Sequence, residues 1–104
     1  MATRPMRIRA KESGGVVSVK VLMAHVMETG QRKDSEGKIV PAWHITNVKA
    51  TCNDKEVLSA QWGPAISRDP YLAFSFKGAK KGDKIEITWI DTKKETRSDT
   101  AEIK

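Results

Sequence analysis

The chain is poor in the residues that build covalent cross-links and metal centres. Its 104 residues include one cysteine, Cys52, and two histidines. A single cysteine cannot form an intrachain disulfide, and it cannot supply the paired thiolates of a Cys-x-x-Cys zinc site. A disulfide-stapled scaffold and a zinc ribbon are therefore excluded, and we expect the fold to rest on its apolar core.

Long apolar segments and stacking aromatics are also scarce. No apolar run approaches the roughly 20 residues that a membrane-spanning helix needs, so we expect no membrane contact. The basic start of the chain lacks the apolar stretch of a secretory signal, so we expect no signal peptide of its own. One tyrosine and two phenylalanines, without a Gly-aromatic stacking string, argue against a single-strand nucleic-acid groove.

The charge of the chain is positive. Nineteen basic and thirteen acidic residues give a formal net charge of +6, which favours association with acidic partners. The basic residues are scattered along the chain, and such residues commonly keep the faces and edges of a small β protein solvated. A general anion- or nucleic-acid-binding module remains one alternative, which salt-dependent binding to random oligonucleotides would reveal.

What the sequence does contain is a period of two. Apolar residues alternate with polar ones in short runs, which is typical of strands with one buried face. The clearest runs are Met6-Ile8-Ala10, Val17-Val19-Val21-Met23, Leu72-Phe74-Phe76 and Ile85-Ile87-Trp89. Residues 43–52 predict a further strand in which the alternation changes parity, and a β-bulge near Thr46 and Asn47 would reconcile its two halves.

About seven such strands, separated by Gly, Asn and Asp turn signals and without a helical stripe, predict the fold class. It is all-β, an immunoglobulin-like antiparallel β-sandwich. The length fits one domain, residues 1–104. We expect one core between the two sheets, made by Val19, Val21, Phe74, Phe76, Ile85, Ile87 and Trp89.

One polar connection is too long to be a tight turn. Residues 25–34 read HVMETGQRKD; they follow an apolar strand and lead toward Trp43 and His44. Long connections in small domains are usually functional or disordered. The two histidines, His25 and His44, stand at either end of this connection, which makes it the first place to look for function.

These histidines raise the question of a metal. With Met23 and Met27 they could form a soft thioether–imidazole copper site; alternatively, Met23 belongs to the core and His25 is hydrogen-bonded to backbone. The order HVME…WHI is also similar to the region of superoxide reductases in which histidines bind a non-haem iron on a β-sandwich, but only His25 and His44 match. We therefore expect no metal, while a small mononuclear metal-binding redox protein using His25 and His44 remains the alternative function.

Recognisable catalytic residues are missing. The histidines have no nucleophile at a recognisable spacing. Cys52 could be a nucleophile or carry a covalent group, but a free cysteine is more often a small, inert, buried hydrophobe. We expect the chain not to be an enzyme.

A second unusual segment is Trp62-Gly63-Pro64, where a tryptophan stands beside a Gly-Pro break. This tryptophan is either a core plug or an anchor at a partner surface, where tryptophan is enriched, and the sequence leaves both open. The candidate contact residues of the two segments are His25, Met27, Glu28, Thr29, Gly30, Arg32, Lys33, Trp62, Gly63 and Pro64.

Five segments of the chain together resemble one bacterial family. They are residues 6–11 (MRIRAK), 20–34 (KVLMAHVMETGQRKD), 40–45 (VPAWHI), 58–78 (LSAQWGPAISRDPYLAFSFKG) and 80–91 (KKGDKIEITWID). The chain resembles, nearly from end to end, the Z subunit of the bacterial Sox sulfur-oxidation system. METGQRKD and QWGPAIS are the most unusual of the shared strings.

This resemblance implies a non-catalytic, cofactor-free subunit that forms a heterodimer with the cysteine-bearing Y subunit, the sulfur carrier of thiosulfate oxidation. It implies transient contacts with the pathway's cytochrome, thiohydrolase and sulfane dehydrogenase. It also implies a periplasmic location, reached by export in the folded state on the partner's twin-arginine signal. The carrier cysteine of that system lies in a Gly-rich C-terminal segment of the Y subunit, whereas this chain ends AEIK.

Overall fold

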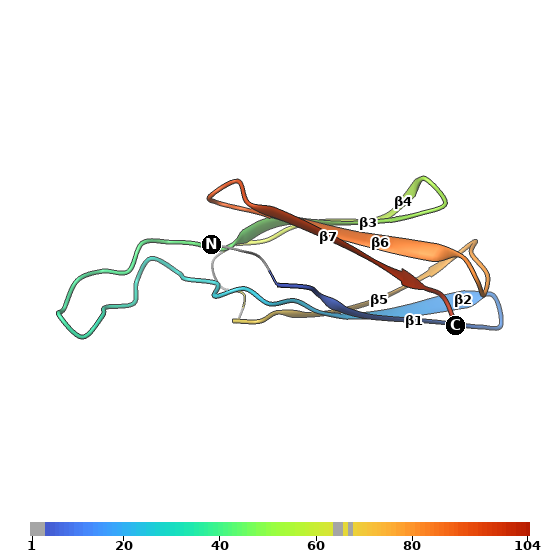
Figure 1. Cartoon of the computed structure of the whole chain (residues 1–104), viewed down its shortest axis with the longest axis horizontal. Coiled ribbons are helices and arrows are strands. Elements are labelled where there is room, and N and C mark those ends of the chain that lie inside the picture. The colour runs from blue at the N-terminus through green and yellow to red at the C-terminus, as the bar shows by residue number, and fades with distance from the viewer. Residues whose placement is uncertain (1–3, 64–65, 67) are drawn as a thin grey trace.

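The chain folds into two antiparallel β-sheets packed face to face (Figure 1). The structure is a computed structural model in which residues 4–63, 66 and 68–104 are described. The three-stranded sheet has the order β1-β2-β5, with β1 at Arg7–Ser13, β2 at Val16–Leu22 and β5 at Tyr71–Lys77. The four-stranded sheet has the order β4-β3-β6-β7, with β3 at Ile45–Cys52, β4 at Lys55–Gln61, β6 at Lys84–Asp91 and β7 at Thr96–Glu102. The expected sandwich of about seven strands is confirmed.

Local turn chemistry explains the hairpin that opens the fold. Gly14 and Gly15 join β1 to β2 with φ values of +60° and +85°. A two-residue turn that matches the twist of its strands needs positive φ at both positions, and glycine adopts it without steric cost. A Cβ at either glycine would meet nothing within 4 Å, so the backbone angle alone selects glycine here.

The predicted bulge is present in β3. Where β3 pairs with β6, the register shifts between Ile45 and Asn47, which is the site of the parity change in the sequence. The strand begins at Ile45 rather than at Trp43, because Trp43 pairs with Glu28 outside the sheet. A second register shift, between Ala50 and Thr51 in the pairing with β4, had no signal in the sequence.

The core lies between the sheets and is built by the inward positions of β2, β3 and β6. Val19, Val21, Ile85, Ile87 and Trp89 are buried as expected. The other two expected core residues, on β5, are only half-buried, although they pack against the core and against each other with ring centroids 6.3 Å apart. These two residues, Phe74 and Phe76, are less buried because β5 is an edge strand of its sheet.

The molecule is elongated, with principal extents of 54 × 20 × 19 Å. Figure 1 shows the cause: the segment between β2 and β3 projects from one end of the sandwich. Across the described residues, no helix is long and apolar enough to cross a membrane.

Candidate functional site

Between β2 and β3 the chain forms a two-sided arm, residues 28–43, that projects from the sandwich (Figure 1). Its sides are joined at the base, where the Glu28 N–H donates to the Trp43 carbonyl at 2.7 Å and the Trp43 N–H donates back at 3.0 Å. Lys33 and Ile39 form a second bridge nearer the tip. The long polar connection is therefore an ordered β-arm.

Side chains along the arm reinforce this pairing. Arg32 donates from Nη2 to Oε1 of Glu28 at 2.7 Å and from Nε to both carboxylate oxygens at 3.1–3.2 Å. The hydrogen bonds from Arg32 lower the pKa of the Glu28 carboxyl. Gly30 has φ +87°, and a Cβ there would lie 3.2 Å from the Ala42 Cβ, so the two sides approach closely only because this residue is glycine. Residues 31–39 are all exposed.

A buried carboxylate holds the base of the arm. Asp91, the last residue of β6, is 1% exposed. Its Oδ2 accepts the His25 Nε2–H at 3.0 Å and the Trp43 Nε1–H at 2.8 Å. Its Oδ1 accepts the backbone N–H groups of Lys93 at 2.9 Å and Glu95 at 3.0 Å. We call Asp91, His25 and Trp43 the Asp91 hub.

The hydrogen bonds of His25 fix its tautomer. The His25 Nδ1 accepts the Met27 N–H at 3.1 Å. In a neutral imidazole the ring hydrogen is then on Nε2, where it faces Asp91. The imidazole is also in edge-on contact with two tryptophans, with centroids 5.3 Å from Trp43 and 5.2 Å from Trp89.

The environment of Asp91 keeps it charged. Burial raises the pKa of its carboxyl, but the hydrogen bonds from His25, Trp43 and the two backbone amides outweigh burial, and the pKa lies below its ordinary value. On the outer side, the Lys93 ammonium lies 3.7 Å from the centroid of the Trp43 ring. An ionised carboxylate thus joins the segment that follows β2, the arm and the end of β6 at one point.

Two expected contact residues are buried in this arrangement. His25 is 5% exposed and Met27 is 4% exposed, so in this fold their side chains support the base of the arm. Met27 has φ +51°, a conformation that costs energy in a residue other than glycine, and its Sδ accepts the Ile45 N–H at 3.3 Å. This bend turns the chain out of the sandwich and into the arm.

The remaining contact candidates lie at the same end of the molecule. Thr29, Arg32 and Lys33 are exposed on the arm, and Glu28 and Gly30 are partly exposed. The N–H of Trp62 donates to the carbonyl of Thr46 at 2.7 Å, just after the arm returns to the sheet. Trp62 is half-buried and packs against the core, while Gly63 is exposed. Pro64 lies outside the described residues.

The residues proposed for a metal are already engaged elsewhere. Both ring nitrogens of His25 and the sulfur of Met27 are in hydrogen bonds, and Met23 is buried in the core. The His44 Nδ1 lies 3.0 Å from the Ile45 carbonyl oxygen. Within residues 4–63, 66 and 68–104, no group of three or more His, Cys, Asp or Glu side chains is placed to hold a metal ion.

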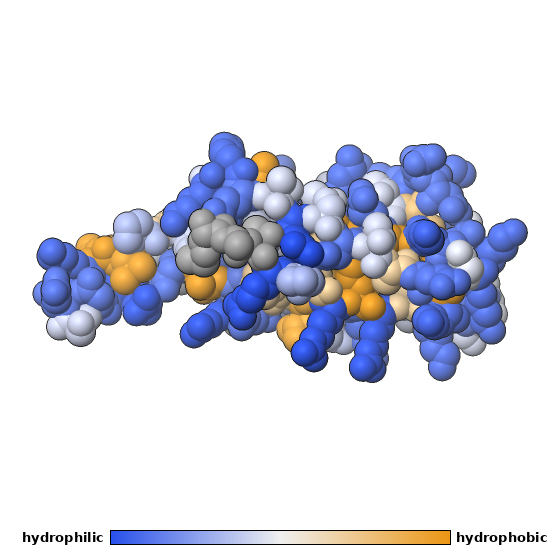
Figure 2. Space-filling model, viewed as in Figure 1, coloured by the Kyte–Doolittle hydropathy of each residue, from blue (hydrophilic) through white to orange (hydrophobic). Residues whose placement is uncertain are grey.

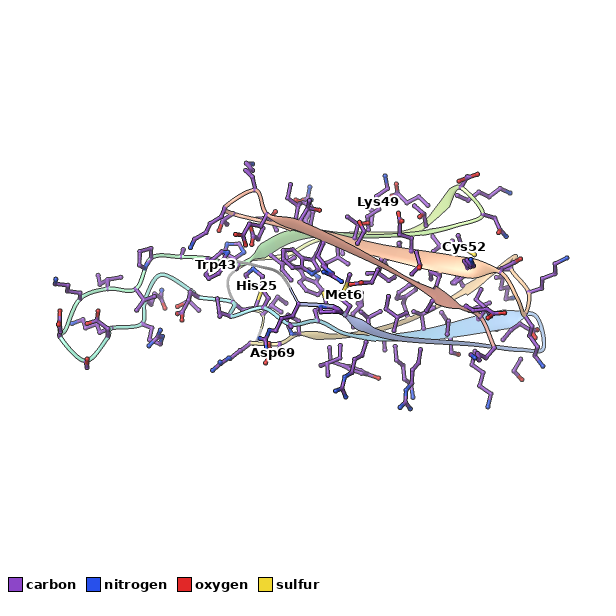
Figure 3. The ribbon with its side chains drawn as sticks, in the orientation of Figure 1. Met6, His25, Trp43, Lys49, Cys52 and Asp69 are labelled. Carbon is purple, nitrogen blue, oxygen red and sulfur yellow. The ribbon has the colours of Figure 1, made fainter. Side chains whose placement is uncertain are left out.

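Cys52 lies far from the arm, near the opposite end of the sandwich (Figure 3). It is 4% exposed. Burial, and secondarily the Asp83 carboxylate, raise the pKa of its thiol, which disfavours the reactive thiolate. The side chain behaves as a small core hydrophobe.

Sequence reasoning overlooked Asp91. A signal existed, since Asp91 follows Ile85, Ile87 and Trp89 at the inward parity of the same strand. A carboxylate at an inward position is costly unless several donors satisfy it. It therefore marks a point where other segments converge.

Comparison with solved structures identifies the fold. The chain is similar to a superoxide reductase in the oxidised state, with 15% identity and a TM-score of 0.65 over 98% of this chain and 89% of that one. It is also similar to a hypothetical protein from Pyrococcus horikoshii, with 16% identity and a TM-score of 0.64 over 98% and 89% of the two chains. A superoxide reductase (neelaredoxin) from Archaeoglobus fulgidus shows 20% identity and a TM-score of 0.56 over 94% and 84%. At such identities the likeness concerns the fold alone, and it agrees with the predicted β-sandwich.

Comparison by sequence identifies the family. No curated protein sequence matches the chain. The family model described as sulphur oxidation protein SoxZ matches residues 6–102, which is nearly the whole chain. The arm, the Asp91 hub and the core strands all fall within the matched residues, and the chain belongs to the SoxZ family of sulphur oxidation proteins.

Proposed function

We propose that this Sox-system protein is the non-catalytic subunit of a heterodimeric sulfur carrier in thiosulfate oxidation, and that its arm recognises the cysteine-bearing Y subunit. Membership of the SoxZ family supports the sulfur-oxidation role. The Y subunit supplies the thiol that carries the sulfur group, and this chain supplies a rigid body by which the pathway cytochrome, thiohydrolase and sulfane dehydrogenase recognise the pair in turn.

The observation that carries this proposal is the support given to the arm. The sandwich does not need the arm to close its sheets, and yet the carboxylate of Asp91 is withdrawn from water to bond both His25 and Trp43 at the arm's base. A non-glycine residue, Met27, takes a positive φ at the same place. An exposed element held this firmly is suited to recognition, because a partner then need not supply the free energy of ordering it.

The chemistry of the remaining residues supports a non-catalytic role. The thiol of Cys52 is buried and its pKa is raised. The ring nitrogens of His25 are both occupied. A carrier that uses a mobile thiol must therefore obtain it from another chain, in agreement with the division of labour proposed for the two subunits.

We further propose that the heterodimer works in the periplasm and is exported already folded. The chain then reaches that compartment on the signal of its partner. Cell fractionation with and without the partner's signal tests this point, and a chain that reaches the periplasm without that signal would contradict it.

The arm proposal is tested by reversing charge on the exposed part of the arm. The double variant Arg32→Glu and Lys33→Glu breaks the ion pair with Glu28 and changes the arm's charge by four units, so we expect binding to the Y subunit to weaken by about tenfold or more, which is about 1.4 kcal/mol. Isothermal titration calorimetry with purified Y subunit measures the dissociation constant.

A matched control variant separates recognition from general electrostatics. Lys80→Glu and Lys81→Glu make the same charge change in the connection between β5 and β6, away from the arm. We expect this control to bind within about threefold of wild type. If the arm variant, the control and the wild type bind the Y subunit equally well, the arm is not part of the interface. If the wild-type chain does not bind the Y subunit at all, the proposed function is wrong.

A further inference from the structure

The outer face of the three-stranded sheet carries charge of one sign. The register places Arg9 of β1 opposite Lys20 of β2, with Lys11 at the next outward position of β1. We call the outward positions of this sheet the basic face. Its charged side chains are Arg7, Arg9, Lys11, Lys20 and Lys77, and its other outward residues include Ser18, Leu22, Tyr71, Ala73 and Ser75. Figure 3 shows long side chains projecting from this side of the sandwich, away from the second sheet.

Among the described residues, no acidic side chain shares this sheet face with the five cations. None of the five cations is in an ion pair with another described residue. The five charges nearly equal the net charge of the whole chain, +6, so the excess charge of the protein is concentrated on one face.

The outer face of the other sheet is different. There Lys49 pairs with Glu56 at 3.6 Å. Lys84 lies opposite Glu102 across β6 and β7, and Glu86 is also outward. Interspersed and paired charges of both signs are usual on the solvated surface of a protein. The single-sign charge of the basic face is therefore not a general property of this protein's surface.

The basic face also carries exposed apolar area. Leu22 and Tyr71 are cross-strand neighbours, and they are 42% and 61% exposed. Along the edge of β1 the face continues into a groove of about 500 Å³ with an apolar lining from Ile8, Ala10 and Ala101. Figure 2 shows apolar surface bordered by projecting hydrophilic side chains on the side of the molecule in view.

Three of the face's cations stand around that groove. Arg9, Lys11 and Lys20 line it together with Lys104, and Glu102 is the acidic residue there. Apolar area ringed by cations complements a protein surface whose acidic residues surround a small apolar centre.

We propose that the basic face is the docking surface for an acidic protein that this chain binds transiently. Charge complementarity favours fast, salt-sensitive association, which suits partners that bind and leave in turn. A permanent subunit interface would have a larger apolar centre than one leucine, one tyrosine and a shallow groove. A single-stranded nucleic acid would stack its bases on several aromatic side chains, and the face has one, Tyr71. The partner's identity rests on the proposed function: it is an enzyme of the sulfur-oxidation pathway.

The test compares charge reversal on the two sheets of the assembled heterodimer. One variant carries Arg9→Glu, Lys11→Glu and Lys20→Glu on the basic face. The control carries Lys49→Glu, Lys55→Glu and Lys84→Glu in the other sheet, for the same change in charge. The probes are the purified pathway cytochrome, thiohydrolase and sulfane dehydrogenase, with a single-stranded DNA oligonucleotide as the competing class of ligand. Surface plasmon resonance measures their binding at low and at physiological ionic strength.

We expect the basic-face variant to bind at least one enzyme about tenfold more weakly at low salt, with a smaller difference at physiological salt. The control should stay within about threefold of wild type. Equal binding of all three enzymes by both variants would overturn the proposal. So would loss of assembly with the Y subunit, which would make the face a permanent interface, or loss of binding only to a DNA oligonucleotide. If the wild-type chain does not pair with the Y subunit, the proposed function fails, and the same series on the chain alone still decides the role of the face.

Discussion

Replacing Asp91 with alanine is expected to lower the free energy of unfolding by about 3 kcal/mol or more. The carboxylate accepts four hydrogen bonds, from the side chains of His25 and Trp43 and from the amides of Lys93 and Glu95. Alanine leaves these four donors without their acceptor in a buried site, since Asp91 is only 1% exposed. An unsatisfied buried donor loses its hydration without compensation.

Urea unfolding followed by tryptophan fluorescence measures this loss. Asp91→Asn tests the mechanism, because its amide offers one oxygen and one NH₂ group where four donors converge, so it should also be clearly less stable than wild type. The carboxyl pKa is lowered in the folded state, so its contribution is present above the unfolded pKa and declines as pH falls below about 4. The gap between wild type and Asp91→Asn should narrow in acid.

Asp83→Ala is the matched control. Asp83 accepts hydrogen bonds from Asn53 and from the Lys80 amide, but these lie in exposed turns at the other end of the sandwich. Its replacement should cost much less stability than that of Asp91. If Asp91→Ala and Asp91→Asn unfold at the same urea concentration as wild type, the hub does not hold the arm to the sandwich.

Shortening the arm is expected to weaken pairing with the Y subunit by at least about a hundredfold, or about 2.7 kcal/mol, while the sandwich still folds. Residues 29–42 are replaced by Asn-Gly. Glu28 and Trp43 exchange both backbone hydrogen bonds, and such a pair is the geometry that a two-residue turn closes. The Asp91 hub is retained, so only the exposed part of the arm is lost.

Analytical ultracentrifugation of the mixed chains measures this effect, and circular dichroism checks the fold. The control is Asp54→Gly, which places an Asn-Gly turn between β3 and β4. Residues 53 and 54 both have positive φ there, so Asn-Gly fits the turn without disturbing the fold. The control should pair as wild type does. A folded, short-armed chain that pairs with wild-type affinity would contradict the proposed role of the arm.

The sandwich could be predicted because its signals are local. The alternation of Val17, Val19 and Val21 and that of Ile85 and Ile87 each lie within one strand, and one buried face suffices to produce them. The bulge after Ile45 was predicted for the same reason, since a parity change is visible in a single stretch of sequence. Fold class, strand number and most of the core therefore follow from the sequence.

The support of the arm could not be predicted in the same way, because it joins distant residues. His25 and Asp91 are 66 positions apart, and Trp43 and Asp91 are 48 apart. The polar composition of the arm indicated an exposed segment, but the burial of His25 and Met27 depends on where β6 ends. The half-burial of Phe74 likewise depends on β5 being an edge strand, which is a property of the sheet order rather than of the strand's own sequence.

Hydrogen–deuterium exchange of the chain, alone and with the Y subunit, tests the central claim most directly. The exchange of backbone amides is compared peptide by peptide, so a contact is located without any substitution. The account predicts slower exchange in residues 28–43 and around Trp62 and Gly63 when the partner is present, with little change in the β3–β4 turn. Slower exchange confined to other parts of the sandwich, with the arm unchanged, would contradict it.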